Sequence, residues 1–205
     1  MAHQALIGQP APHLTLPNYT GEPYSLKPGE NDVTTAIFFY PRSGTWGCTK
    51  QACQFRDAIA ERPEFQSDKV QVIGISPDPV WRQKLFVEKQ NLTYPVLSDE
   101  KGEARRAYHV GRGLWGLADL RVTFVIDSKG IIRYGFPCMF CLCSTMIGPA
   151  NRDALDTTSI NYASHCKFVS RVLETLRKEG DKTAQISEPV RDEDASYAGT
   201  KGSTQ

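Results

Sequence analysis

Hydrophobic residues recur along the chain in two patterns, one typical of buried strands and one typical of amphipathic helices. Continuous β-branched and aromatic runs at 34–40 and 70–75 predict strands that are buried on both faces. Between them, apolar residues return every three or four positions over 46–59, which predicts one face of a helix that Pro63 ends. The first half of the chain therefore predicts a strand, a helix and a second strand.

The rest of the chain continues this alternation. Strands that alternate with helices predict right-handed crossovers and a parallel sheet, and a late hairpin adds antiparallel pairing. The expected fold class is therefore α/β: a mixed β-sheet flanked by helices, as in the thioredoxin-like fold. The remaining predicted elements are a short strand at 13–16, a helix capped by Asp78 and Pro79 that runs to about Gln90, a strand at 94–97, a helix near 103–108, a hairpin of strands 122–126 and 131–136, and a helix from Tyr162 that Gly180 stops.

Two segments depart from this order. Residues 137–158 have no periodicity, although a connection of this length between a strand and a helix is uncommon. Residues 181–205 consist mainly of Ser, Thr, Gly and charged residues, a composition that predicts a disordered polar tail. We therefore expect one thioredoxin-like domain over residues 1–180, with an unusual cysteine-containing insertion at about 137–158.

Composition narrows the function classes. Lys and Arg number 24 and Asp and Glu 23, so the net charge of the chain is too small to attract it to nucleic acid or to an anionic membrane. No apolar run resembles a signal peptide or a membrane span, which predicts a soluble intracellular protein. Six cysteines are too few and too unevenly spaced for a secreted disulfide framework. In a reducing compartment such cysteines more often serve catalysis or metal binding.

Cys48 follows a buried strand and a turn, and it lies in the first turn of the predicted helix. Unpaired N–H groups and the helix dipole favour a thiolate at that place. Lowering a thiol pKa from about 8.5 to about 6 requires about 3.4 kcal/mol. A helix terminus supplies at most about 2 kcal/mol, so further donors are needed. The hydroxyl of Thr45 is one candidate donor. The alternative for an isolated cysteine here is a buried structural role.

The wider pattern around this cysteine decides between the two alternatives. Pro41-x-x-x-Thr45-x-x-Cys48, followed by Cys53, resembles the peroxiredoxin active-site signature. The surrounding sequence is similar to the peroxiredoxin Q branch, also called bacterioferritin comigratory protein. The segments that carry the resemblance are 39–57, 7–12, 97–99, 121–127 and 161–165.

By this resemblance Cys48 is the peroxidatic cysteine and Cys53 the resolving one. Thr45 and Arg121 would donate to thiolate and peroxide, and Pro41 would shield the site. The implied reaction reduces hydrogen peroxide and organic (alkyl) hydroperoxides through a sulfenic acid and a disulfide, which thioredoxin reduces. It requires no metal, flavin or other cofactor, and the resemblance favours a monomer. One departure is Trp46, which occupies a position where this branch usually has proline.

The other cysteines carry weaker signals. Cys138, Cys141 and Cys143 form C-x2-C-x-C, and with Cys166 or His165 they could complete a tetrahedral zinc site. The same spacing also suits a thiol relay. We favour an apolar loop, because C-x-C is a poor zinc knuckle and Cys166 falls on the apolar stripe of its helix. Metal analysis of the purified protein tests the zinc hypothesis.

Two other functions remain open at this level. The first is a thioredoxin-like disulfide reductase or isomerase, although Thr45-x-x-Cys48 stands where such enzymes have Cys-x-x-Cys. The second is a non-enzymatic redox sensor that passes oxidation to a partner protein. The expected location is the cytoplasm. The nucleus is the alternative, because related fungal thiol peroxidases can be nuclear, yet the chain has no dense basic run.

Overall fold

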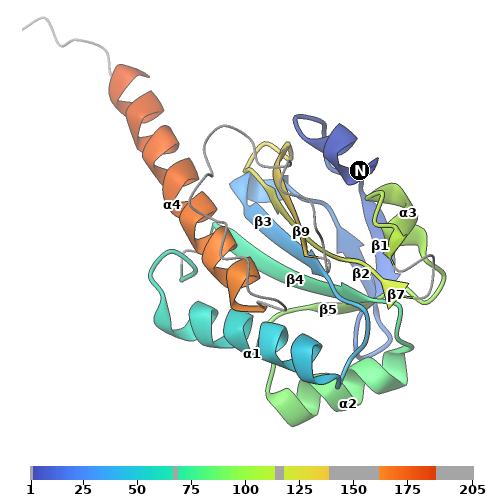
Figure 1. Cartoon of the computed structure of the whole chain (residues 1–205). Helices are drawn as coiled ribbons and strands as arrows, with labels where there is room; N and C mark the ends of the chain where they lie inside the picture. Colours follow the sequence, from blue (N-terminus) through green and yellow to red (C-terminus); the bar gives the residue numbers. More distant parts are fainter. Residues whose placement is uncertain (1, 67–68, 114–117, 139–161, 188–205) are drawn as a thin grey trace, which may run out of the picture.

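A five-stranded sheet forms the centre of the protein (Figure 1). The computed structural model describes residues 2–66, 69–113, 118–138 and 162–187. The strands of the central sheet, in spatial order, are β5 (Val96–Ser98), β4 (Val70–Ser76), β3 (Thr34–Phe39), β8 (Arg121–Ile126) and β9 (Ile132–Cys138). Its helices are α1 (Trp46–Glu61), α2 (Val80–Gln90), α3 (Glu103–Ala107) and α4 (Tyr162–Ser187).

The pairing directions confirm the predicted mixed sheet. Strand β3 is parallel to β4, and β4 is parallel to β5, because a helix crosses over between each pair. Strand β8 is antiparallel to both β3 and β9. The β8–β9 hairpin and its turn at 127–130 also match the prediction. The smaller elements are η1 (Ala2–Leu6), η2 (Glu30–Asp32), the antiparallel pair β1 (Leu14–Pro17) and β2 (Pro23–Leu26), and the pair β6 (Arg112–Gly113) and β7 (Ala118–Asp119).

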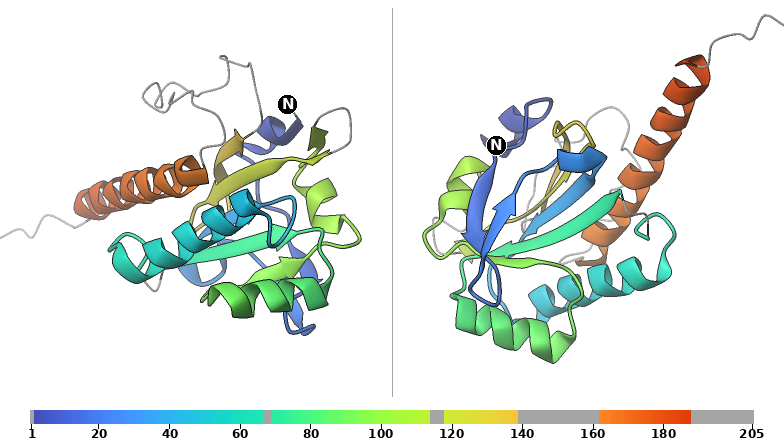
Figure 2. Two further views of the ribbon diagram at one scale, coloured as in Figure 1. Left: turned by 60° about the horizontal axis from the view of Figure 1, so that its bottom comes forward. Right: turned by 180° about the vertical axis from the view of Figure 1, so that it is seen from behind.

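Alternation of side chains along β3 divides the core into two clusters, one on each face of the sheet. Phe38 packs in a cluster with residues of α1, α2 and α4, whereas Phe39 packs in a cluster with α3 and the N-terminal strands. Helices α1 and α4 therefore lie on the same side of the sheet (Figure 2). None of the helices in the described ranges combines the length and the apolar character that a membrane crossing needs.

Two predicted helix boundaries are wrong. Asp78 does not cap α2: the N-cap is Pro79, and the Asp78 carboxylate accepts hydrogen bonds from Ser43 N and Ser76 Oγ instead. Helix α4 continues through Gly180 to Ser187, so Gly180 does not end the helix. The boundary between domain and tail at 180 stays a prediction. A helical glycine costs about 1 kcal/mol relative to alanine, which a long helix tolerates. Residues 188–205 of the predicted tail and 139–161 of the predicted insertion lie outside the described residues.

Candidate active site

Cys48 lies where strand β3 passes through a short turn into helix α1. Strand β3 ends at Phe39, Thr45 is the N-cap and α1 begins at Trp46. The Cys48 thiol is therefore in the first helical turn, where backbone N–H groups have no acceptor within the helix. Its side chain is only 2% exposed and belongs to the core cluster beneath α1. A charge on this sulfur would be stabilised by protein donors rather than by bulk water.

Arg121 supplies the nearest charged donor. Strand β8 runs antiparallel to β3 with Val122 opposite Phe39, so Arg121 lies at the end of the sheet where α1 begins. Its Nη2 donates to Cys48 Sγ at 3.2 Å, across 73 positions of sequence. The structure thus brings the predicted nucleophile and the predicted guanidinium together.

Gln51 holds the other arm of this guanidinium, and the sequence analysis did not single it out. Arg121 Nη1 donates to Gln51 Oε1, and Gln51 is completely buried. Gln51 follows Cys48 by three positions on α1, so both side chains lie on one face of the helix. The available signal was a polar residue on the apolar face of the predicted helix. With both arms held, the guanidinium has a fixed orientation toward the sulfur.

Thr45 and Pro41 adjoin the site without contributing such a contact. The Thr45 hydroxyl donates to the Arg42 carbonyl oxygen at 3.0 Å rather than to Cys48. Its role as a donor to sulfur or peroxide therefore stays a prediction. Pro41 is half-buried in the turn immediately after Tyr40. Its shielding role also stays a prediction.

Cys53 is on the same helix as Cys48 but on a different side. Its half-buried Sγ donates to Gln90 Oε1 at 3.5 Å. Cys48 and Cys53 are both free thiols. Five positions along an α-helix separate two Cα atoms by about 8–9 Å, whereas a disulfide tolerates at most about 7 Å. The two thiols can form a disulfide only if the first part of α1 opens.

Buried charged and polar groups fix the turn that presents Cys48. Arg105 Nη2 donates to the Tyr40 carbonyl oxygen at 2.9 Å, and the Asp78 carboxylate accepts from the backbone N–H of Ser43. The Tyr40 hydroxyl lies 3.1 Å from Ser43 Oγ. Asp78 and Arg105 come from distant segments, and no local motif in the sequence indicated their role. They hold the turn in place independently of α1.

The structure describes two of the other residues that the sequence analysis considered as zinc ligands, Cys166 and His165. Cys166 is 4% exposed in the core, and burial raises the pKa of its thiol to about 11, as expected for a structural cysteine. Burial, and then the nearby charge of Arg121, lower the pKa of His165 to about 3. Its Nδ1 lies 2.7 Å from Thr123 Oγ1. Cys141 and Cys143 lie outside the described residues, within which no cluster of metal ligands occurs.

Together the fold and the site define a class: a thioredoxin-like protein in which a buried thiol is paired with a guanidinium at a helix N-terminus. Comparison with known proteins names the family. The AhpC/TSA family matches residues 7–135, more than half of the chain, so the chain belongs to that family. A putative peroxiredoxin of Mycobacterium tuberculosis is 44% identical over 115 residues, which span 55% of this chain and 73% of that protein. The chloroplastic peroxiredoxin Q of Arabidopsis thaliana is 40% identical over 126 residues, 62% of this chain and 56% of that protein.

Solved structures agree with this assignment. Peroxidoxin BcpB of Mycobacterium tuberculosis superposes with a TM-score of 0.57 at 38% identity, covering 64% of this chain and 84% of that chain. The bacterioferritin comigratory protein of Xanthomonas campestris shares the fold, with a TM-score of 0.60 at 23% identity over 79% of this chain and 90% of that chain. The resemblance to peroxiredoxin Q is thereby confirmed. The protein is a thiol peroxidase.

Proposed function

We propose that Cys48 is the peroxidatic cysteine of a thioredoxin-linked peroxidase and that Cys53 resolves its oxidised form. The observation that carries this proposal is the 3.2 Å contact between Arg121 Nη2 and the buried Cys48 Sγ. A guanidinium at this distance stabilises a thiolate, which is the nucleophilic form of cysteine. Cys53 is the free, half-buried thiol nearest in sequence.

In the first step the Cys48 thiolate attacks the terminal oxygen of the hydroperoxide. The S–O bond forms as the O–O bond breaks, and the departing oxide takes a proton to leave as water or an alcohol. Sulfur is oxidised to the sulfenic acid. A thiol of ordinary pKa is about 3% ionised at pH 7, so complete ionisation increases the rate at most about 30-fold. The larger contribution is stabilisation of the charge that develops as O–O breaks. Arg121 is oriented for that role by Gln51.

In the second step the Cys53 thiol attacks the Cys48 sulfur, a disulfide forms and water leaves. The first part of α1 opens for this step, because the helical geometry keeps the two Cα atoms too far apart. Thioredoxin then supplies two electrons and restores both thiols. We propose hydrogen peroxide and organic hydroperoxides as substrates. Alkyl peroxide reduction activity is described for the bacterioferritin comigratory protein of Xanthomonas campestris, which shares this fold, and this supports the second class. A monomer in the cytoplasm is part of the same proposal.

A coupled assay with thioredoxin, its reductase and NADPH tests the proposal on hydrogen peroxide and on a bulky hydroperoxide. We expect saturable NADPH oxidation with both peroxides in the wild type and none above background in Cys48→Ser. Cys166→Ser is the matched control, because it changes a buried free cysteine outside the site. It should retain turnover once its folding is verified. Insulin reduction without peroxide consumption would instead indicate a disulfide reductase.

Hydrogen exchange tests the opening of α1. On conversion to the Cys48–Cys53 disulfide, amide exchange should rise sharply across residues 47–55, while strands β3 and β4 stay protected. Equal protection of that stretch in both redox states would contradict the opening of α1.

A further inference from the structure

Helices α1 and α2 carry three of the large apolar side chains that are most exposed. Among the described residues, those that are most exposed are Trp46, Trp81, Leu85 and Ile7. Trp46 is 68% exposed at the start of α1, and Trp81 and Leu85 are each 59% exposed on α2. Trp81 and Leu85 are four positions apart, so they are neighbours on the helix surface. Exposed apolar side chains that cluster in this way mark a binding surface more often than scattered ones do.

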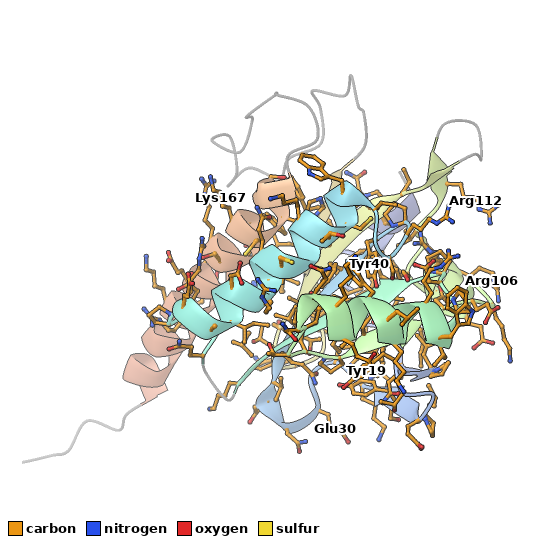
Figure 3. The ribbon with its side chains drawn as sticks, turned by 90° about the horizontal axis from the view of Figure 1, so that it is seen from below. Tyr19, Glu30, Tyr40, Arg106, Arg112 and Lys167 are labelled. Carbon is orange, nitrogen blue, oxygen red and sulfur yellow. The ribbon has the colours of Figure 1, made fainter. Side chains whose placement is uncertain are left out.

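A groove joins Leu85 of this pair to the start of α1, and Trp81 lies one helical turn before Leu85. It has a volume of about 480 Å³ and lies between α1 and α2, with Leu85, Lys89 and Gln90 on one wall and Trp46 and Lys50 on the other. Figure 3 shows the two helices side by side from the side that faces away from the sheet. Leu85 is therefore continuous, through this groove, with the turn that precedes Cys48.

Positive charge surrounds the apolar pair. Lys84 and Lys89 are exposed on α2, and Lys50 lies across the groove on α1. Glu88 is the single acidic residue of α2. The whole chain has a formal charge of only +1, so this excess is local. We call the residues Trp81, Lys84, Leu85 and Lys89 the α2 face.

The α2 face also adjoins the resolving thiol. Gln90, the last residue of α2, lines the groove and accepts the hydrogen bond from Cys53 Sγ. Formation of the Cys48–Cys53 disulfide opens the first part of α1 and so changes the wall that contains Trp46 and Lys50. Helix α2 lies outside the stretch 47–55 that we expect to open. It is therefore the wall that a reductant meets in the oxidised protein.

We propose that the α2 face docks the protein dithiol that reduces the Cys48–Cys53 disulfide. The matching partner has an apolar surface beside its dithiol, which covers Trp81 and Leu85, and acidic side chains at the rim, which face Lys84 and Lys89. Tryptophan anchors of this kind dominate binding energies at interfaces. The surrounding lysines increase the association rate. The inference rests on the proposed function, because it requires the disulfide.

The reduction that follows docking is balanced between the two proteins. One partner thiolate attacks Cys53 Sγ, the disulfide breaks and Cys48 leaves as a thiolate. The second partner thiol then attacks the mixed disulfide, loses its proton and releases Cys53. The partner ends as a disulfide and this protein as two thiols, a transfer of two electrons.

Direct reduction of the oxidised protein tests the surface without peroxide. The protein is oxidised with diamide and then reduced by thioredoxin, its reductase and NADPH, or by dithiothreitol alone. We expect Trp81→Ala/Leu85→Ala to lower the second-order rate constant with thioredoxin at least tenfold and to leave the rate with dithiothreitol unchanged. Alanine is the best helix former, so α2 is retained. Ile7→Ala, an exposed apolar residue in the N-terminal segment, is the matched control.

The contribution of Lys84 and Lys89 to docking is tested by measuring how the rate constant depends on salt concentration. In the wild type the rate constant with thioredoxin should fall as ionic strength rises, because exposed charges are screened. In Lys84→Glu/Lys89→Glu it should be at least tenfold lower at low salt, and the salt dependence should be reduced or reversed. Lys129→Glu, an exposed residue in the β8–β9 turn, is the control for the charge change and should behave as the wild type.

Two results would overturn the docking surface. In the first, both double variants react with thioredoxin at rate constants within twofold of the wild type. In the second, thioredoxin cannot reduce the wild-type protein after diamide has oxidised it. A dimer in solution that only Trp81→Ala/Leu85→Ala dissociates, with unchanged reduction, would assign the face to self-association instead. Failure of the wild type to consume peroxide with dithiothreitol would contradict the proposed function. The diamide experiment would still decide the docking surface.

Discussion

Replacing Arg121 by lysine should slow the reaction with peroxide about 10²-fold, although the positive charge is kept. The arginine side chain serves two partners at once, since Nη2 donates to Cys48 Sγ at 3.2 Å and Nη1 donates to Gln51 Oε1. A lysine ammonium is a single point charge and cannot reproduce this planar fork. It can bond to Gln51 or to the sulfur, but it cannot hold both in the same geometry.

The magnitude follows from the distance and the burial. With an effective dielectric constant of about 20, a unit charge at 3.2 Å from the sulfur contributes about 5 kcal/mol, and the same charge at about 5 Å contributes about 3 kcal/mol. The difference of about 2 kcal/mol corresponds to about 30-fold in rate. Loss of one oriented donor to developing charge typically costs about 10²–10³-fold. Because Cys48 is 2% exposed, bulk water cannot replace that donor.

The assay is a stopped-flow single turnover with hydrogen peroxide, which reports the second-order rate constant apart from resolution and reduction. Trp46, at the start of α1, gives a fluorescence signal close to the reacting sulfur. Arg133→Lys is the matched control, since Arg133 makes only half-exposed ion pairs with Asp127 and Glu179 and should leave the rate unchanged. A rate constant for Arg121→Lys within threefold of the wild type would refute the role assigned to the guanidinium.

Three further predictions concern the same region. Cys53→Ser should give a rapid single turnover to sulfenic acid but no sustained turnover with thioredoxin, and it should over-oxidise more readily at high peroxide. Full thioredoxin-linked activity of this variant would place the resolving thiol elsewhere, and the cysteines at 138–143 would be the first to examine. Gln51→Leu should lower the rate constant about tenfold, because it removes the hydrogen bond that the charged Arg121 guanidinium donates to Gln51. A hydrogen bond of this kind contributes about 1.5 kcal/mol. An unchanged rate constant would show that Gln51 is not a positioning residue. The pKa of His165 is lowered from an ordinary value of 6.5 to about 3, so the folded protein binds fewer protons than the unfolded chain between these pH values. The free energy of unfolding is therefore highest above pH 6.5 and falls by about 1.4 kcal/mol for each pH unit below it. Urea unfolding at pH 6.5 and 5 should show a loss of about 1.6 kcal/mol that His165→Gln lacks. An equal loss in the variant would assign it to other groups.

Local periodicity was sufficient to predict most of the secondary structure. Strands β3 and β4, helix α1 and the β8–β9 hairpin lie where the apolar patterns predicted them, because burial on one face imposes a period of 2 or 3.6 residues on the sequence itself. Cys48 in the first helical turn follows from the same pattern. The ends of helices were less certain. Asp78 looks like an N-cap, yet its carboxylate accepts from Ser43 and Ser76, and Gly180 looks like a stop that α4 passes.

The pairing of Cys48 with Arg121 is invisible to any local pattern, because it joins positions 73 apart. The resemblance to peroxiredoxin Q named both residues, but the contact itself depends on the antiparallel register of β8 against β3. The same register decides that Gln51, a buried polar residue on an apolar helix face, holds the guanidinium. The groove beside the α2 face likewise exists only because α1 and α2 lie side by side on the sheet. Sequence specifies which side chains each element buries or exposes, whereas only the order and register of the strands decide which of those side chains meet.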